Sequence, residues 1–385
     1  MRPFLVILAL LLVVLAVVAA FVAGYTLRGD TRAGSTASSG SLDALVIAEL
    51  KAHYYKPVNA ASLDQAGVVA TLKSLHDPYT VYMTAQQTQA LAQSLSGSYS
   101  GIGAAFDKRG KALVVTQVFA GSPARAAGIV AGDTIVSVDG RAVGNETADV
   151  SAARIRGADG TKVTLGVRTG GTGSVRSITL TRRKIAAPET ETKLLHRGGK
   201  TIGYIYLPSF ATGAGAAVAT DVARLRARGA QAFVLDLRYD LGGWITEARD
   251  VSSDFLSGGV VVSTHGLHEP TQIYYATGHP ATTLPLVVLV NHWSASASEI
   301  TAGALQDHHR ATIIGTRTYG KGVAQTNFSL PGGATLHMTI AGYLTPSGRN
   351  INHKGITPNV TVADNLKTPR DEALDRALQY LVSGY

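Results

Sequence analysis

Three serines and a lysine 25 residues beyond the middle one are the residues of this 385-residue chain best suited to covalent chemistry. Ser294, Ser296 and Ser298 follow the apolar run 286–290 and directly precede the apolar run 300–305. A buried strand followed by a helix places a serine on the connecting turn, where unpaired helix amides face any developing negative charge. Spacing alone leaves open which of the three serines is the nucleophile.

The lysine is Lys321, which stands between Gly320 and Gly322. A serine hydroxyl needs a base to take its proton, and a lysine is a base only in its neutral form. Burial disfavours the ammonium and lowers the pKa, and flanking glycines let backbone pack closely around the side chain. We therefore predict a serine hydrolase with a lysine base. Taken separately, the two motifs also fit a capped helix start and an ordinary turn with a solvated lysine.

The surrounding sequence resembles the carboxy-terminal processing peptidases, also called tail-specific proteases. The resemblance rests on residues 294–299, 302–307 and 318–322. It implies that Ser296 is the nucleophile, that Lys321 is the general base and that Gln325 orients the lysine. The expected enzyme is a serine-type endopeptidase that acts on polypeptides.

A second motif is a strand-like run that ends in paired glycines, Gly242 and Gly243. Paired glycines let backbone amides point into a cleft without a Cβ in the way. The resemblance implies that one of these two amides joins the amide of Ala297 in an oxyanion hole. The chain has Asp240 and Leu241 where the family usually has Asn and Pro, so we expect a less rigid loop.

Residues 99–183 change to a pattern of short strands and resemble a PDZ domain, most specifically over 122–140. PDZ domains bind extended chain ends by strand addition, and their loop amides hold the terminal carboxylate. The resemblance implies that Gly101, Ile102 and Gly103 bind the free C-termini of polypeptide substrates. Because a PDZ domain is a binding module, a catalytically silent scaffold is one alternative function.

We predict an α/β catalytic domain, with a mixed sheet and flanking helices, a small PDZ domain and an N-terminal helical segment. The boundaries are 1–28 for a signal anchor or signal peptide, 29–41 for a flexible linker, 42–98 for the helical region, 99–183 for the PDZ domain and 184–385 for the protease core. Residues 76–80, which also resemble a family segment, are interpreted as a proline-containing helix stop without a catalytic role.

Residues 4–23 form an unbroken apolar run of 20 residues. As one transmembrane helix they would span about 30 Å, the thickness of a hydrocarbon core. We predict a single-pass cell-membrane anchor with the catalytic part outside the cytoplasm. If the segment is instead cleaved as a signal peptide, the enzyme is secreted. The sequence leaves open whether the protein forms a homo-oligomer.

The composition argues against several other classes. The net charge is +9, but the Lys and Arg residues are scattered and form no basic stripe with interleaved aromatics, so we expect no nucleic-acid partner. The chain has no Cys, which excludes disulfides and a cysteine nucleophile. It has no His-Glu-x-x-His or phosphate-binding motif, so we expect neither a metal nor another cofactor.

A conventional Ser/His/Asp triad is the remaining rival to a lysine base. The chain has many aspartates and 11 histidines, of which His292, His308, His309 and His353 are available as the base. None of them lies in a recognisable hydrolase motif.

Overall fold

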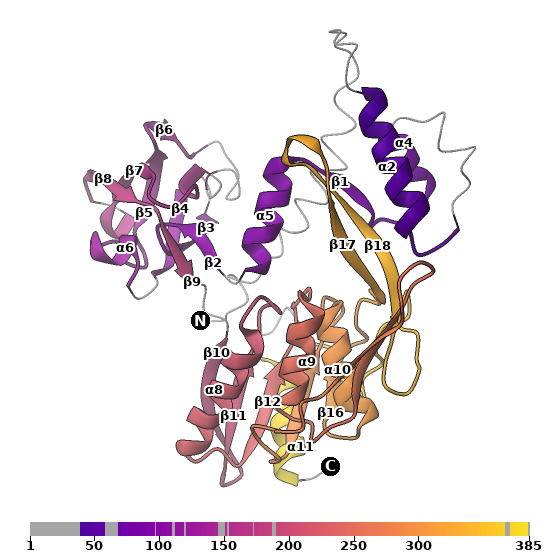
Figure 1. Ribbon diagram of the computed structural model, residues 1–385. Coiled ribbons are helices and arrows are strands. Elements are labelled where there is room, and N and C mark those ends of the chain that lie inside the picture. Colours follow the sequence, from indigo (N-terminus) through magenta and orange to yellow (C-terminus); the bar gives the residue numbers. More distant parts are fainter. Residues whose placement is uncertain are drawn as a thin grey trace. The chain divides into compact units, whose positions relative to one another are not determined.

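The computed structural model of the chain (Figure 1) describes residues 39–57, 68–96, 98–109, 112–118, 121–144, 151, 154–171, 173–186, 190–365 and 370–383. These residues fall into two units. Unit 1 lies within 98–187, and unit 2 combines 34–97 with 188–385. The predicted N-terminal helical region and the predicted protease core therefore belong to one structural unit.

Unit 1 is a small β structure around its own apolar core. Its main sheet has the order β3, β4, β5, β7, β8, with β6 paired to β5. These strands are β3 (Ala104–Arg109), β4 (Ala112–Val118), β5 (Thr134–Val138), β6 (Arg141–Ala142), β7 (Lys162–Arg168) and β8 (Val175–Thr181). A second ladder joins β2 (Ser98–Gly101) to β9 (Arg183–Ala186), and α6 (Pro123–Ala126) follows its N-cap Ser122. The core includes Leu113 of β4, Ile129 of the segment after α6 and Leu165 of β7.

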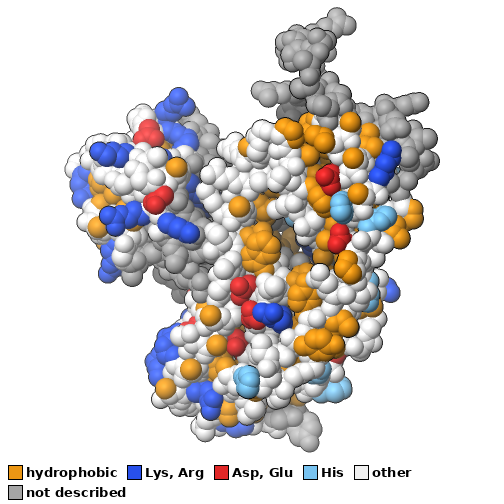
Figure 2. All heavy atoms as spheres, in the orientation of Figure 1, with side chains coloured by type: hydrophobic (Ala, Val, Ile, Leu, Met, Phe, Trp, Pro, Cys, Tyr) orange, Lys and Arg blue, Asp and Glu red, His pale blue; other side chains and the backbone are white. Residues whose placement is uncertain are grey.

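Most of the net positive charge lies in this unit. Residues 98–187 contain thirteen Lys and Arg against six Asp and Glu. On the visible face, the basic side chains are spread over the unit rather than gathered on one strand (Figure 2).

The centre of unit 2 is a six-stranded mixed sheet in the order β10, β11, β12, β15, β16, β19. Its strands are β10 (Glu191–Arg197), β11 (Lys200–Tyr206), β12 (Ala232–Asp236), β15 (Leu286–Val290), β16 (Thr312–Gly315) and β19 (Val360–Thr361). Only β10 runs antiparallel to its neighbour. Every residue of β12 and β15 is buried, as expected for parallel strands covered on both faces.

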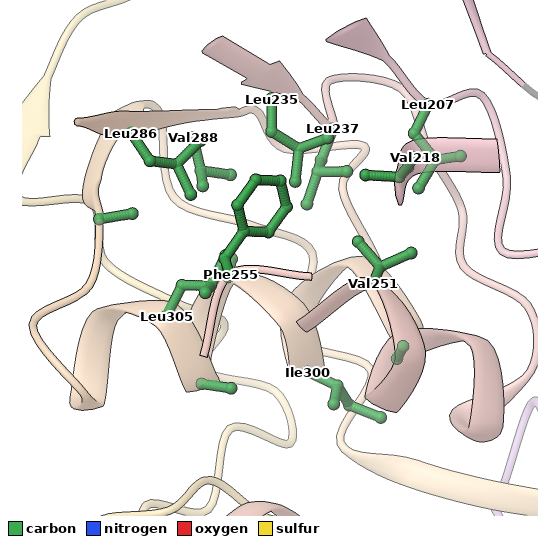
Figure 3. Close-up of a cluster of buried hydrophobic side chains, with 14 of the residues drawn as sticks. Leu207, Val218, Leu235, Leu237, Val251, Phe255, Leu286, Val288, Ile300 and Leu305 are labelled. Atoms are coloured by element: carbon green, nitrogen blue, oxygen red, sulfur yellow. The ribbon is translucent and has the colours of Figure 1, made fainter. Parts of the chain in front are cut away.

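Helices α8 (Ala214–Ala227), α9 (Ile245–Ser253) and α10 (Ala297–Asp307) share one core with the sheet, and α11 (Glu372–Ser383) packs separately against its strands. Figure 3 shows the shared core, with Phe255 between side chains of the strands, such as Val288, and side chains of the helices, such as Leu305. This packing fixes the carboxyl end of β15, from which the chain enters α10.

A second sheet in unit 2 has the order β1, β18, β13, β14, with β17 also paired to β18. These strands are β1 (Val81–Met83), β13 (Val260–His265), β14 (Gln272–Tyr275), β17 (Val323–Ser329) and β18 (Thr335–Leu344). Helices α2 (Ser39–His53), α4 (Val68–Ser74) and α5 (Ala85–Leu95) belong to the same unit (Figure 1). Val46, Leu50 and Leu72 pack on Leu336 and Met338, so the N-terminal helices bury their apolar faces on the β17–β18 hairpin.

Within the described residues, no helix has both the length and the apolar character required to cross a bilayer. The predicted transmembrane segment, residues 4–23, and residues 29–38 of the predicted linker lie outside the described residues. The last three residues of that predicted linker, 39–41, belong to helix α2.

Candidate active site

Ser296 occupies the turn between β15 and α10, as the sequence predicts. Its backbone has φ 57° and ψ −115°, a conformation that residues other than glycine rarely adopt. Strained backbone of this kind at a strand-to-helix turn is typical of a nucleophile presented at the end of a sheet. Helix α10 begins at the next residue, Ala297, so its first amides lie beside the serine.

The three serines have different environments. Ser294 Oγ donates a hydrogen bond of 2.8 Å to the Leu237 carbonyl, and Ser298 Oγ donates one of 2.9 Å to the Asp240 carbonyl. Both side chains are fully buried, whereas Ser296 is partly exposed. Ser296 is therefore the one serine of the triplet that a substrate can reach.

One carboxylate joins the serine turn to the lysine loop. Glu299 is fully buried. Its Oε2 accepts the Ser296 amide at 2.9 Å and the Lys321 amide at 2.8 Å. Its Oε1 accepts the Thr318 hydroxyl at 2.6 Å and the Gly320 amide at 2.7 Å. Four donors on two oxygens hold the two loops in a fixed relation, so Glu299 positions both proposed reacting residues.

Lys321 has the lowered pKa that a lysine base requires. Burial lowers its pKa to about 8, against the opposing effects of Asp77 and Glu299. Its Nζ lies 5.0 Å from the centre of the Tyr79 ring. The Tyr343 hydroxyl donates to the Lys321 carbonyl, so the backbone of the lysine is held from both sides.

The glycines beside the lysine are packed as closely as predicted. A Cβ at Gly322 would lie 2.5 Å from the Asn352 amide nitrogen, and one at Gly320 would lie 3.0 Å from the Lys354 amide nitrogen. The Gly320 φ of 91° also favours glycine. Larger residues at either position would push the lysine loop away from its supporting segment.

Gln325 lies on β17, and its Nε2 donates to the Val323 carbonyl and to Thr339 Oγ1, both at 3.3 Å. In the described part of the chain, no hydrogen bond joins it to Lys321. Its orienting role stays a prediction, and in this conformation the Glu299 carboxylate and the Tyr343 hydroxyl hold the Lys321 backbone instead.

The two glycines of the predicted oxyanion loop differ. The Gly242 amide donates to Asp240 Oδ1 at 2.7 Å, so in this conformation it is not free to bind an oxyanion. Among the described residues, the amides of Gly243 and Ala297 have no hydrogen-bond acceptor. A Cβ on Gly242 would lie 2.7 Å from Ser296 Cβ, so this glycine packs directly against the serine.

Asp240 is fully buried, and its Oδ2 has no hydrogen-bond partner within the described residues. Burial raises the pKa of this carboxyl well above its usual range, although the Gly242 amide opposes the shift. The departure from the family's Asn therefore places beside the oxyanion loop a carboxyl group whose neutral form is favoured by burial.

The histidines do not form a triad with Ser296. His308 and His309 follow the last residue of the 11-residue helix α10, whose length puts them about 16 Å from the serine. His292 stacks near Trp293, and in the described chain none of the four candidates, His353 included, hydrogen bonds to Ser296. The structure likewise places no group of three or more His, Asp or Glu side chains, among the residues it describes, where they could hold a metal ion.

The predicted carboxylate-binding loop lies in unit 1, between β2 and β3. Gly101 ends β2, Ile102 is buried and Gly103 has a φ of 74°, a conformation that requires glycine. The Ile102 carbonyl accepts the Ala124 amide of α6 at 2.8 Å. Within the described residues, the amides of Ile102 and Gly103 donate no hydrogen bond, as a loop that receives a carboxylate would require.

Sequence reasoning missed three residues of this site. Glu299 stood inside the recognised serine motif, and its position three residues after the serine is the spacing that lets a helix N-terminus receive a carboxylate. Tyr79 lies in the segment interpreted as a simple helix stop, but its ring faces the lysine. Tyr343 lies in β18, outside the recognised motifs, and no local signal distinguishes it.

Comparisons with known proteins match parts of both structural units. Residues 201–362 match the model of peptidase family S41, and residues 114–169 match a PDZ domain model. The chain is 38% identical over 309 residues to the carboxyl-terminal-processing protease of Picosynechococcus sp., which covers 80% of this chain and 75% of that protein. The chain belongs to peptidase family S41. It is a serine-type peptidase of the carboxyl-terminal-processing group that carries a PDZ domain.

Two further relatives of this S41 peptidase extend the match over most of its length. The carboxyl-terminal-processing protease of Synechocystis sp. is 35% identical over 345 residues, which cover 87% of this chain and 81% of that protein. The solved photosystem II D1 C-terminal processing protease shares 29% identity with a TM-score of 0.55, covering 90% of this chain and 98% of that one. The PDZ domain and the peptidase family together fit a polypeptide substrate.

Proposed function

We propose that this S41 peptidase is an endopeptidase in which Ser296 is the nucleophile and Lys321 is the general base. The observation that supports this assignment most strongly is the buried Glu299 carboxylate, which accepts the backbone amides of both residues. The accessible Ser296 and the lowered pKa of Lys321 supply the reactivity that the mechanism needs.

In this mechanism the neutral Lys321 takes the proton of Ser296 while Ser296 Oγ attacks the scissile carbonyl. The amides of Ala297 and of Gly243 or Gly242 stabilise the oxyanion, and Gly242 joins them only after leaving Asp240. The Lys321 ammonium then protonates the leaving amine, and water hydrolyses the acyl-enzyme. Every proton that the lysine takes is returned within the cycle.

We further propose that the PDZ domain recognises polypeptide C-termini through Gly101, Ile102 and Gly103, and that the enzyme works outside the cytoplasm. The open amides of the loop support the first point. The apolar run at 4–23 supports the second, as a single-pass anchor or, if cleaved, as a secretion signal.

Alanine substitution tests the catalytic assignment. Ser296→Ala and Lys321→Ala should each abolish cleavage of an unfolded model protein, with unchanged circular dichroism, because each removes a group that no neighbour replaces. Single substitutions of His292, His308, His309 and His353 serve as matched controls and should retain substantial activity. A histidine variant that loses activity while Lys321→Ala retains it would exclude the lysine base.

Tail recognition is tested with pairs of substrates that differ only at the end of the chain. A substrate with a free apolar C-terminal residue should be cleaved faster than its amidated form, mainly through a lower KM, because the PDZ loop binds the terminal carboxylate. Gly103→Leu should remove that preference without affecting cleavage of a short peptide. Equal rates for the acid and amide substrates would leave the domain no role in selecting tails.

A further inference from the structure

The Lys321 side chain meets an aromatic ring from a distant part of the sequence. Tyr79 lies 242 positions before Lys321, in the turn between α4 and β1, and its ring centre is 5.0 Å from Lys321 Nζ. That distance is within the range of a cation–π contact. The phenol is not itself a competing base, because burial, and then the neighbouring Tyr319, raise the pKa of Tyr79 well above its ordinary value.

The turn that carries Tyr79 is held by its own carboxylate. Asp77 Oδ1 accepts the Tyr79 amide at 3.0 Å, and Asp77 Oδ2 accepts the Thr80 hydroxyl at 2.6 Å. The Tyr54 hydroxyl of the N-terminal helical region also reaches Asp77 Oδ2, at 3.4 Å. Three donors from three residues therefore fix the turn.

The same turn is attached to the sheet that follows the lysine loop. Thr80 Oγ1 accepts the Thr339 amide of β18 at 3.0 Å, and Val81 of β1 pairs with His337 of β18. Figure 1 shows β1 beside the β17–β18 hairpin, and β17 begins at Val323, two residues after Lys321. The turn that carries the Tyr79 ring is therefore hydrogen bonded to the β17–β18 hairpin, which begins two residues after Lys321.

We propose that Tyr79 is a positioning residue for the base. Its ring holds the Lys321 amino group in the protonated form, which Lys321 adopts after taking the Ser296 proton, through a cation–π contact, while the Asp77 turn fixes the ring. This inference rests on the proposed Ser/Lys mechanism. It makes the N-terminal helical region of the chain a part of the active site, because that region supplies both the ring and its anchor.

A cation–π contact predicts the direction in which the pKa of Lys321 is shifted. The ring attracts the ammonium and not the neutral amine, so it raises the pKa of Lys321 against the lowering effect of burial. The other titratable or charged groups that face the lysine are Asp77 on the same turn, Glu299 of α10, and His337 and Tyr343 of β18. Substitutions at Tyr79 leave all four in place.

The experiment compares wild type, Tyr79→Phe and Tyr79→Leu in the full chain, with kcat/KM for a short peptide measured from pH 6 to 10. Tyr79→Phe keeps the ring and should leave the midpoint of the pH profile unchanged. Tyr79→Leu keeps the apolar cover but removes the ring, so the midpoint should fall by about 0.4 to 1.5 units. Activity above the midpoint should fall by about two- to thirtyfold, because Lys321 becomes an ammonium as it takes the Ser296 proton and the ring no longer stabilises that charge.

A midpoint that stays or rises in Tyr79→Leu would overturn the proposal, because a purely structural role lowers activity without lowering the midpoint. If Tyr79→Leu fails to fold, a trifluorinated phenylalanine at position 79 keeps the shape of the ring and weakens its attraction for cations. It should lower the midpoint relative to Tyr79→Phe, and an unchanged midpoint would again overturn the proposal.

Lys321→Ala, measured in parallel, distinguishes a failure of the Ser/Lys mechanism from a failure of the role proposed for Tyr79. If that variant remains active, the Ser/Lys mechanism itself fails. If it is inactive while the ring variants leave the midpoint unmoved, only the role of Tyr79 fails.

Discussion

Two buried carboxyl groups flank Ser296, and they differ in the number of hydrogen bonds that their side chains accept. Glu299, on the side of the lysine loop, accepts four hydrogen bonds of 2.6 to 2.9 Å on its two oxygens. On the side of the oxyanion loop, Asp240 Oδ1 accepts a hydrogen bond of 2.7 Å from the Gly242 backbone amide, and Asp240 Oδ2 has no hydrogen-bond partner among the described residues. Neither side chain is accessible to solvent.

The pKa values follow from this difference. Burial raises the pKa of both groups, but at Glu299 the donors of Thr318, Gly320, Ser296 and Lys321 oppose the effect. At Asp240 only the Gly242 amide and the Ser298 hydroxyl oppose the effect, and the pKa is raised well above its ordinary value. The base side of the site is therefore preorganised around a carboxylate with four donors. On the oxyanion side, burial favours the neutral form of Asp240, whose Oδ1 accepts one of the candidate oxyanion amides.

Of the substitutions at the two buried carboxyl groups, Glu299→Gln should have the larger effect, and that effect should appear in kcat. Each carboxylate oxygen of Glu299 accepts two hydrogen bonds. In either orientation of the substituted glutamine side chain, its NH₂ group would replace one of these oxygens and face two hydrogen-bond donors without an acceptor. We expect kcat to fall by about 100-fold with little change in KM, because the serine and the lysine lose their mutual placement. Steady-state kinetics and a thermal melt would measure this, and Glu191→Gln on the exposed strand β10 is the matched control. Wild-type kcat in Glu299→Gln would show that the carboxylate does not position the reacting residues.

Asp240→Asn should have a smaller effect, which appears in stability rather than in rate. A raised folded-state pKa means that the stability contributed by the neutral acid is fully present below the unfolded pKa of about 3.9 and is lost as pH rises above it. The Asn variant lacks this loss, so it should melt near the wild-type temperature at pH 4 and above it at pH 8. Its kcat should stay within a few-fold of wild type, since Asn keeps an acceptor for Gly242. A difference in Tm that does not grow with pH would contradict the neutral state of Asp240.

Local sequence patterns predicted the parts of this site that lie close together in the chain. The apolar run 286–290, the following helix and the glycines around Lys321 all specify local backbone, and the structure has them where predicted. The contact between Tyr79 and Lys321 was not predictable in this way, because it depends on pairing between β1 and β18. The same holds for Tyr343, whose hydroxyl meets the lysine loop only through tertiary packing.

The choice of serine shows the same limit at shorter range. Spacing could not distinguish Ser294, Ser296 and Ser298, because all three alternate with alanines before one helix. Burial distinguishes them, since only Ser296 is exposed in part. For Gln325 the predicted partner and the observed partners differ, because its amide binds Val323 and Thr339 on the hairpin.

The most direct test of the Ser296 and Lys321 pairing is the rate at which a fluorophosphonate labels the serine as a function of pH, with the labelled peptide identified by mass spectrometry. We expect the label on Ser296 and a labelling rate that rises through a single midpoint near pH 8, where Lys321 loses its proton. Lys321→Ala should remove this rise. A labelling rate that is already maximal at pH 6, or that keeps its pH dependence in Lys321→Ala, would contradict the lysine base.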